Sequence, residues 1–231
     1  MSEDEVQPDT FEMPTTKGGI LSLKEINGIP IEQIETNMQP GEISLEGFLG
    51  ENERLIDVLM ADFKAVQRLG VSNQDIGYAI NYLFIATNYP PPPWQLGGRP
   101  SSYLSDLKHK LFDEGVVVEL YSKRFLVELH TYERNPYETR VQKSPMGDDY
   151  EVDAMDIRVI DMDAAQVESL KEYNDGLVSG KIPFGKYQRK YANILPYLIS
   201  QYGFYEGKES PYRHDPEDIV SFLNIPRAKP S

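Results

Sequence analysis

The spacing of apolar residues predicts helices in the first part of the chain. Apolar side chains recur at helical spacing from residue 53 to 69, and Gly70 suits a left-handed helix end. Ser72 and Asp75 have the spacing of a capping box, which predicts a second helix to about residue 87. The short link between them predicts an N-terminal helical hairpin. Before it, residues 19–50 alternate apolar pieces with Gly and Pro, which predicts short strands or an extended strap.

The middle of the chain carries the clearest β pattern. Two runs of alternating apolar residues flank residues 122–123 and predict a β-hairpin. With a two-residue turn there, Leu120 faces Phe125, and the apolar residues of both strands share one face. Residues 140–143 and 157–160 are expected to add a third and a fourth strand to an antiparallel sheet.

Start and stop residues predict the remaining helices. Asp163 suits the N-cap of a helix that runs through Leu170, and residues 187–202 form a helical stretch that Pro196 must kink or divide. Asp215-Pro216 is a typical helix start, and residues 103–112 have the pattern of a short helix. The chain is therefore expected to be an α+β protein, with an antiparallel sheet of about four strands and five to six helices.

The composition predicts one compact domain. It covers residues 20–225, between a flexible acidic tail at 1–19 and a flexible tail at 226–231. A sub-boundary at residues 89–101 is indicated by a run of four prolines followed by Trp94.

Charge narrows the classes of partner. The chain has 37 acidic and 23 basic residues and a formal net charge of −14, which disfavours nucleic acid and anionic membranes and favours a cationic partner. It has no Cys, so disulfides, thiol catalysis and thiolate metal sites are excluded. No apolar run approaches the roughly 20 residues of a membrane span, and the polar start is unlike a secretory signal, so a cytoplasmic location is expected.

Two small constellations could carry acid–base chemistry. Glu128 and His130 lie two residues apart on the hairpin face that is expected to be exposed, and such a pair can ligate a metal or transfer protons. The turn Tyr212-Arg213-His214 precedes a helix start and could recognise an anion there, or it could be a structural turn held by Arg213.

A basic and aromatic segment follows an acidic one. Lys186, Arg189 and Lys190 alternate with aromatic residues and could contact phosphates or bases, or pair with the acids of residues 145–175. A calcium loop that begins at Asp149 would place Ala154 where Gly is needed, so this acidic segment predicts no metal site and the chain no cofactor.

Three parts of the chain resemble a family of uncharacterised bacterial proteins. They are Gly47–Glu53 with Leu59–Asp62, Gln142–Pro145, and Gly203–Gly207 with Tyr212–Pro216. The resemblance implies a bacterial origin and a single unit that spans both halves of the chain. It implies no catalytic role, because no activity is established for that family.

These observations favour a non-enzymatic cytoplasmic protein that binds a basic protein, for example as an inhibitor or an immunity-type partner. The alternative is a small-molecule or metal-dependent enzyme that combines Glu128 and His130 with the Tyr212–His214 turn. RNA binding through Lys181–Tyr191 is a third hypothesis. The sequence leaves the oligomeric state open.

Overall fold

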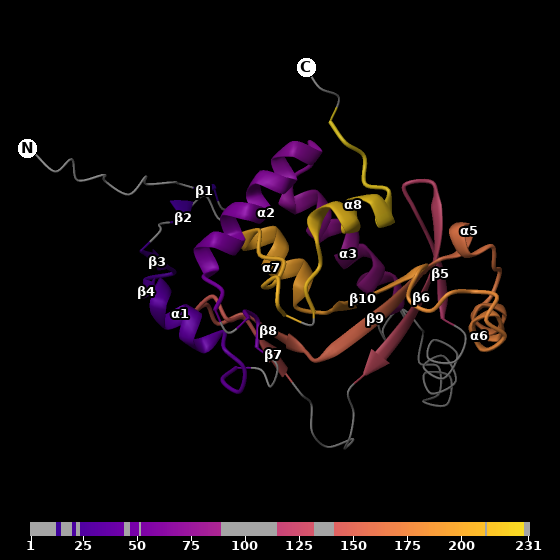
Figure 1. Ribbon diagram of the computed structural model, residues 1–231, viewed down its shortest axis with the longest axis horizontal. Helices are drawn as coiled ribbons and strands as arrows, with labels where there is room; N and C mark the ends of the chain where they lie inside the picture. The colour runs from indigo at the N-terminus through magenta and orange to yellow at the C-terminus, as the bar shows by residue number, and fades with distance from the viewer. Residues whose placement is uncertain are drawn as a thin grey trace, which may run out of the picture.

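The computed structural model describes residues 13–14, 20–21, 24–43, 47–50, 52–88, 115–131, 141–210 and 212–228. The helices in these residues are α1 (Ile31–Asn37), α2 (Leu55–Leu69), α3 (Asn73–Asn88), α5 (Met162–Ala165), α6 (Leu170–Val178), α7 (Leu195–Tyr202) and α8 (Pro216–Leu223). The strands are β1 (Met13–Pro14), β2 (Ile20–Leu21), β3 (Glu25–Ile26), β4 (Ile29–Pro30), β5 (Val116–Leu120), β6 (Lys123–Thr131), β7 (Val141–Lys143), β8 (Glu151–Asp153), β9 (Met155–Asp161) and β10 (Gln188–Ala192). The predicted α+β class is confirmed (Figure 1).

A four-stranded antiparallel sheet with the strand order β10-β9-β6-β5 forms the centre of the fold. The predicted hairpin supplies β5 and β6, and the strand predicted over 157–160 is β9. The placement of residues 140–143 in this sheet was wrong, because β7 pairs with β8 in a separate ribbon. Val141 and Lys143 are both exposed, so β7 has no apolar face to bury against the central sheet.

The fourth strand of the sheet is β10, and the helix predicted over 187–202 was wrong in its first part. In β10, Tyr191 is buried and pairs with Ile157 of β9, while its neighbours on either side are more exposed. Helix α7 begins only at Leu195, so Pro196 lies in its first turn instead of forming a kink. Proline is favoured there because the first-turn N–H groups have no partner within the helix.

The register of the β5–β6 hairpin differs from the prediction by two residues. The turn is Tyr121-Ser122, and Leu120 pairs with Lys123 instead of Phe125. Both turn residues have positive φ, +48° and +64°, which gives the twist that two-residue hairpins favour. A shift by two keeps every side chain on its predicted face, so Phe125 still points into the core.

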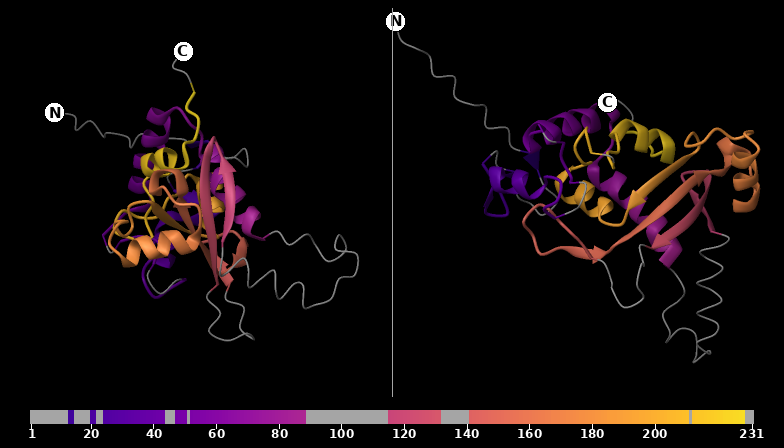
Figure 2. Two further views of the ribbon diagram at one scale, coloured as in Figure 1. Left: turned by 90° about the vertical axis from the view of Figure 1, so that its right-hand side faces the viewer. Right: turned by 60° about the horizontal axis from the view of Figure 1, so that its bottom comes forward.

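The prediction of an exposed hairpin face was wrong for β6, whose two faces are both covered, whereas Val117 and Glu119 of β5 are exposed on the predicted face. On one face, Phe125 and Val159 belong to a core that includes side chains of α3, α7 and α8. On the other face, Leu126 and Ile160 pack with residues of α5 and α6. The first core joins residues from before and after the predicted sub-boundary at 89–101. Figure 2 shows α1, in indigo, and α6, in orange, near opposite ends of the molecule.

The N-terminal helices follow the prediction in their caps. Gly70 ends α2 at a φ of +66°, and the Ser72 hydroxyl and Asp75 carboxylate make the reciprocal hydrogen bonds of a capping box. Before these helices, residues 25–30 form the β3–β4 ribbon, as the predicted short strands required. Residues 31–37 were also predicted to be extended, which was wrong, because they form α1. Ile31 and Ile34 lie at helical spacing and are buried in a second core with α2.

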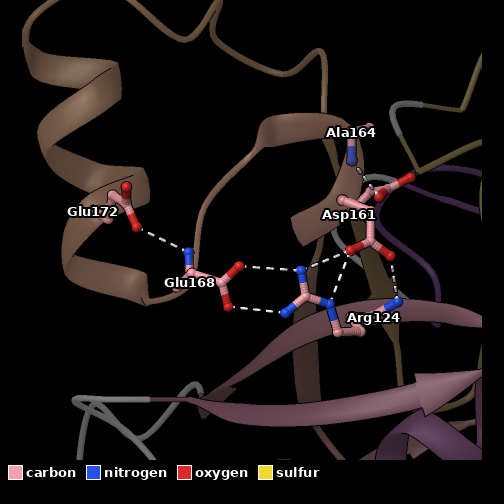
Figure 3. Close-up of polar contacts among 6 residues, drawn as sticks. Arg124, Asp161, Ala164, Glu168 and Glu172 are labelled. Atoms are coloured by element: carbon pink, nitrogen blue, oxygen red, sulfur yellow. Dashed lines mark hydrogen bonds and ion pairs between the residues drawn. The ribbon is translucent and has the colours of Figure 1, made fainter.

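The helix predicted from Asp163 through Leu170 is two helices. Asp161, and not Asp163, caps α5, and Ser169 caps α6. Between them Gln166 takes a φ of +58°, which ends α5. Asp163 instead accepts a hydrogen bond from the Arg124 backbone, and Figure 3 shows the Arg124 guanidinium facing the Glu168 carboxylate. These contacts join the β5–β6 hairpin to the α5–α6 connection.

The predicted helix over 103–112 and the Pro-rich segment that contains Trp94 lie outside the described residues. The same holds for most of the predicted tail at 1–19, apart from Met13–Pro14 in β1. Each helix in the described part of the chain is too short or too polar to span a membrane.

Substitution of Gly77 tests the packing of α3 on α7. Alanine in a helix is normally about 1 kcal/mol more stable than glycine. At Gly77, however, a Cβ atom would lie 2.7 Å from the Pro196 carbonyl oxygen and 2.8 Å from Ser200 Cβ. We therefore expect G77A to lower the free energy of unfolding by about 1–3 kcal/mol in urea titrations. The exposed Asn81 is the control, and N81A should leave stability unchanged or raise it. A stabilised G77A variant would contradict this packing.

Candidate functional site

The candidate site lies at the free edge of β10. The backbone groups of Arg189 and Tyr191 face β9, since the flanking residues Tyr187 and Asn193 bond to that strand. The alternate residue Lys190 therefore directs its backbone groups away from β9, and the His214 imidazole donates a hydrogen bond to the Lys190 carbonyl there. The His214 backbone N–H also donates to the Tyr205 carbonyl, so residues 205–206 and 212–214 form a wall beside this edge.

A cavity of about 330 Å³ lies between the edge strand and this wall. The polar side chains that line it include Asp156, Arg189, Lys190, Glu206, Tyr212 and His214. Four of these residues, Arg189, Lys190, Tyr212 and His214, are predicted site residues from two separate parts of the sequence. We call this cavity the sheet-edge pocket.

The basic side chains of the pocket are held in ion pairs. Lys190 Nζ lies 2.5 Å from an Asp156 carboxylate oxygen, and the Arg189 guanidinium contacts both carboxylate oxygens of Asp218 at 2.6 Å. The Arg189 guanidinium also lies over the Phe222 ring at 5.0 Å from its centre. An incoming anion would have to compete with carboxylates that already occupy these cations.

Glu206 differs from the other acids of the pocket. Its side chain is 3% exposed and accepts one hydrogen bond, at 2.7 Å, from the Ser210 hydroxyl. It makes no ion pair within the part of the chain that the structure describes. The Glu206 pKa is raised to about 7, mainly by burial and to a smaller extent by the negative charge of Asp156. The hydrogen bond from Ser210 and the positive charge of Arg213 lower the pKa, but by less. Glu206 is therefore partly protonated at neutral pH.

His214 is held in its neutral form. Its ring contacts the Tyr191 ring, with centres 4.9 Å apart. Burial lowers the His214 pKa to about 4, although Asp218 and the hydrogen bond to the Lys190 backbone oppose this shift. At neutral pH the pocket thus contains a partly protonated carboxyl group beside a neutral imidazole.

Arg213, the middle residue of the Tyr212–His214 turn, does not line the pocket. Its guanidinium makes a two-point ion pair with Asp62 of α2 and donates to the Glu206 carbonyl at 2.6 Å. Asp62 is 1% exposed, and burial raises its pKa more than Arg213 lowers it. Arg213 thus positions the backbone that carries Glu206, while Tyr212 remains 42% exposed beside the pocket.

The other predicted site residues lie elsewhere. Glu128, expected on an exposed face, is 9% exposed and pairs with Arg158 at 2.5 Å on the neighbouring strand. His130 pairs with Asp156 in the β6–β9 ladder, and its side chain lies outside the described set. Lys186 lies over the Tyr187 ring at 5.0 Å and does not line the pocket.

Asp156 and Glu206 line the pocket but are not among the residues predicted from the sequence. Nothing in the sequence distinguishes Asp156 as a site residue, because it is one of many acidic residues in the same segment. Glu206 lies in a stretch on which the family resemblance rests, between Gly203 and Gly207, and that position was its only signal. Within the described residues, no three His, Asp or Glu side chains are placed to hold a metal ion.

A larger hollow of about 710 Å³ runs along α6. Its charged residues include Lys171, Glu172 and Asp175, which are exposed, and Lys171 pairs with Asp175. The sheet-edge pocket is the better candidate because its carboxyl groups are buried. Comparison of the chain with protein-family models, curated proteins and solved structures finds no match, so the site rests on its geometry.

Glu206 and His214 change the free energy of unfolding in opposite directions as pH changes. The Glu206 pKa rises from 4.5 to about 7 on folding, so its contribution falls as pH rises through this range. The His214 pKa falls from 6.5 to about 4, so its contribution is present above pH 6.5 and is lost as pH falls toward 4. The two slopes oppose each other between pH 4.5 and 6.5.

The variant E206Q separates the contribution of Glu206 to this pH dependence from that of His214. Relative to the wild type, E206Q should gain about 3 kcal/mol of unfolding free energy between pH 4 and pH 8, because it has no carboxylate to desolvate. H214Q should gain relative to the wild type as pH falls from 6.5 to 4. Urea titrations across this pH range measure both effects. The exposed Glu42 gives the control, E42Q, whose curve should parallel that of the wild type. A parallel curve for E206Q would rule out the raised pKa.

Proposed function

We propose that this protein is an acidic protein-binding module, and that a Lys or Arg side chain of its basic partner enters the sheet-edge pocket. The observation that carries the proposal is Glu206, a buried carboxyl group with a hydroxyl partner and no ion pair among the residues that the structure describes. An ionised carboxylate in such a place costs stability unless a cation joins it. A partner's ammonium or guanidinium group would supply that cation.

Charge supports the same class of partner. The net charge of −14 attracts basic proteins over long range and accelerates their approach. Inside the pocket, Lys190 and Arg189 are neutralised by Asp156 and Asp218. A bound cation leaves these pairs in place, whereas an anion must break one. The half-exposed Tyr212 adds an aromatic surface over which a cationic side chain can lie.

The same geometry weakens the support for RNA binding. Of the basic residues in Lys181–Tyr191, Arg189 and Lys190 are committed to internal carboxylates. This leaves Lys181 and Lys186 exposed, which is a small positive surface on an acidic protein. An inhibitor or immunity-type protein, which neutralises a basic bacterial protein by binding it, is one concrete form of the proposed function.

A small-molecule enzyme that uses the same pocket is the second candidate. Glu206 favours it, because a buried carboxyl group with a pKa of about 7 is suited to donate and accept protons at neutral pH. Its substrate would be a cationic or uncharged molecule that fits beside Glu206 and His214. The pocket offers no metal-binding group of three His, Asp or Glu among the described residues.

Binding of a basic peptide tests the proposed function. The probe is a decapeptide of alternating Lys and Gly, titrated calorimetrically at pH 8, where Glu206 is ionised. We expect E206Q to weaken binding at least tenfold, or about 1.4 kcal/mol, because the buried partner of the cation is lost. E42Q removes the same charge from an exposed position and should change binding less than twofold. Equal losses in the two variants would show that only the mean charge matters and would contradict binding in the pocket.

A further inference from the structure

Among the described residues, β5 is the last strand of the sheet on the side opposite the pocket. The two-residue turn makes Leu120 and Lys123 a hydrogen-bonded pair, so the backbone groups of Val118 also bond to β6. Those of Val117 and Glu119 therefore point away from β6. Within the described residues, neither backbone has a hydrogen-bond partner on that side. The Val117 side chain is 55% exposed.

This edge lacks the usual protection against strand pairing. Natural edge strands are blunted by lysines, prolines or bulges. Strand β5 has the sequence Val-Val-Val-Glu-Leu, with Glu119 as its one charged residue, and its pairing with β6 is regular over all five residues. It therefore presents backbone donors and acceptors that a further strand can satisfy.

An apolar helix face accompanies this edge. Tyr78, Tyr82 and Ile85 follow one another at helical spacing on α3 and are 63%, 49% and 47% exposed. Helix α3 packs against β5, so the stripe lies on the helix that adjoins this strand. From Gly77 to Asn88 the helix has no charged residue. In a chain of net charge −14, such a surface is one that an equally acidic copy can approach without strong repulsion.

We propose that a second copy of this chain pairs with β5, so that two antiparallel β5 strands join two central sheets into one across a two-fold axis. The hydrogen-bonding alternation fixes which residues can lie on the axis. With Val118 on the axis, Val117 lies opposite Glu119 of the partner subunit. With Glu119 on the axis, two carboxylates would face each other, which is unfavourable. With Val117 on the axis, Glu119 would lie opposite Gly115, which is outside β5. The register centred on Val118 is therefore the one that pairs all five residues of β5, with the two α3 stripes on the same face of the joined sheet.

Sedimentation of the full chain tests this interface. We expect the sedimentation coefficient to rise with concentration from that of a 26.4 kDa monomer to that of a dimer. V117K places a charge on the open edge and should weaken association at least tenfold, and Y82K should do the same at the helix stripe. V178K is the matched control, because Val178 is 90% exposed on α6 and belongs to neither β5 nor α3, so it should leave association unchanged. A monomer at every concentration, or a dimer that V117K leaves intact, would overturn the proposal.

The register has a separate test, because the chain has no Cys. Mixing V117C with E119C chains should give a disulfide-linked dimer under mild oxidation, since the two residues lie directly opposite. V117C alone should cross-link at least tenfold less, because its copies lie diagonally, beyond the usual reach of a disulfide. Equal cross-linking of V117C alone and of the mixture would overturn the register centred on Val118. Dimerisation and binding of the Lys–Gly peptide are measured independently, so either result can fail without the other.

Discussion

The sheet-edge pocket depends on the buried ion pair between Asp62 and Arg213. It ties helix α2 to the C-terminal segment, and the same guanidinium holds the Glu206 carbonyl. The segment that it holds forms the wall of the pocket beside β10. Removing one partner of a buried ion pair leaves an uncompensated charge and typically costs 3–5 kcal/mol. Glu53 adds to the attachment by accepting hydrogen bonds from the backbone of Lys208 and Glu209. Residues that lie far apart in the sequence thereby become one site.

Within this frame, Glu206 is a local cost to stability. Burial disfavours its carboxylate form, and it makes no ion pair within the described part of the chain. Folding alone would be served better by a neutral side chain of the same shape. Stability and activity often conflict at binding sites for this reason. The neutral His214 acts in the opposite direction at acid pH, so neither group sets the pH dependence of stability by itself.

The parts of the fold that were predictable depend on local patterns. Gly70, the Ser72–Asp75 capping box and the two-residue periodicity around Phe125 each specify structure within a few residues. The strand β10 was not predictable in this way, because Arg189 and Lys190 precede a helix without a break and only pairing with β9 makes them extended. The pocket was partly predictable: Tyr212, His214, Arg189 and Lys190 were found as two separate sites. Their meeting, and the role of Glu206, depend on tertiary packing that the sequence does not display.

The two edges of the sheet differ in whether they can accept another strand. At β10 the His214 imidazole donates to the outward carbonyl of Lys190 and its segment lies beside the strand, so this edge cannot readily accept another strand. At β5 the outward backbone groups have no such cover in the described chain, so self-pairing is directed to the edge away from the pocket. A dimer formed there would leave both pockets accessible. Two pockets on one assembly could bind two basic side chains of a single partner, and the second contact would then form at high effective concentration. Self-association would in this way strengthen binding without adding a contact inside either pocket.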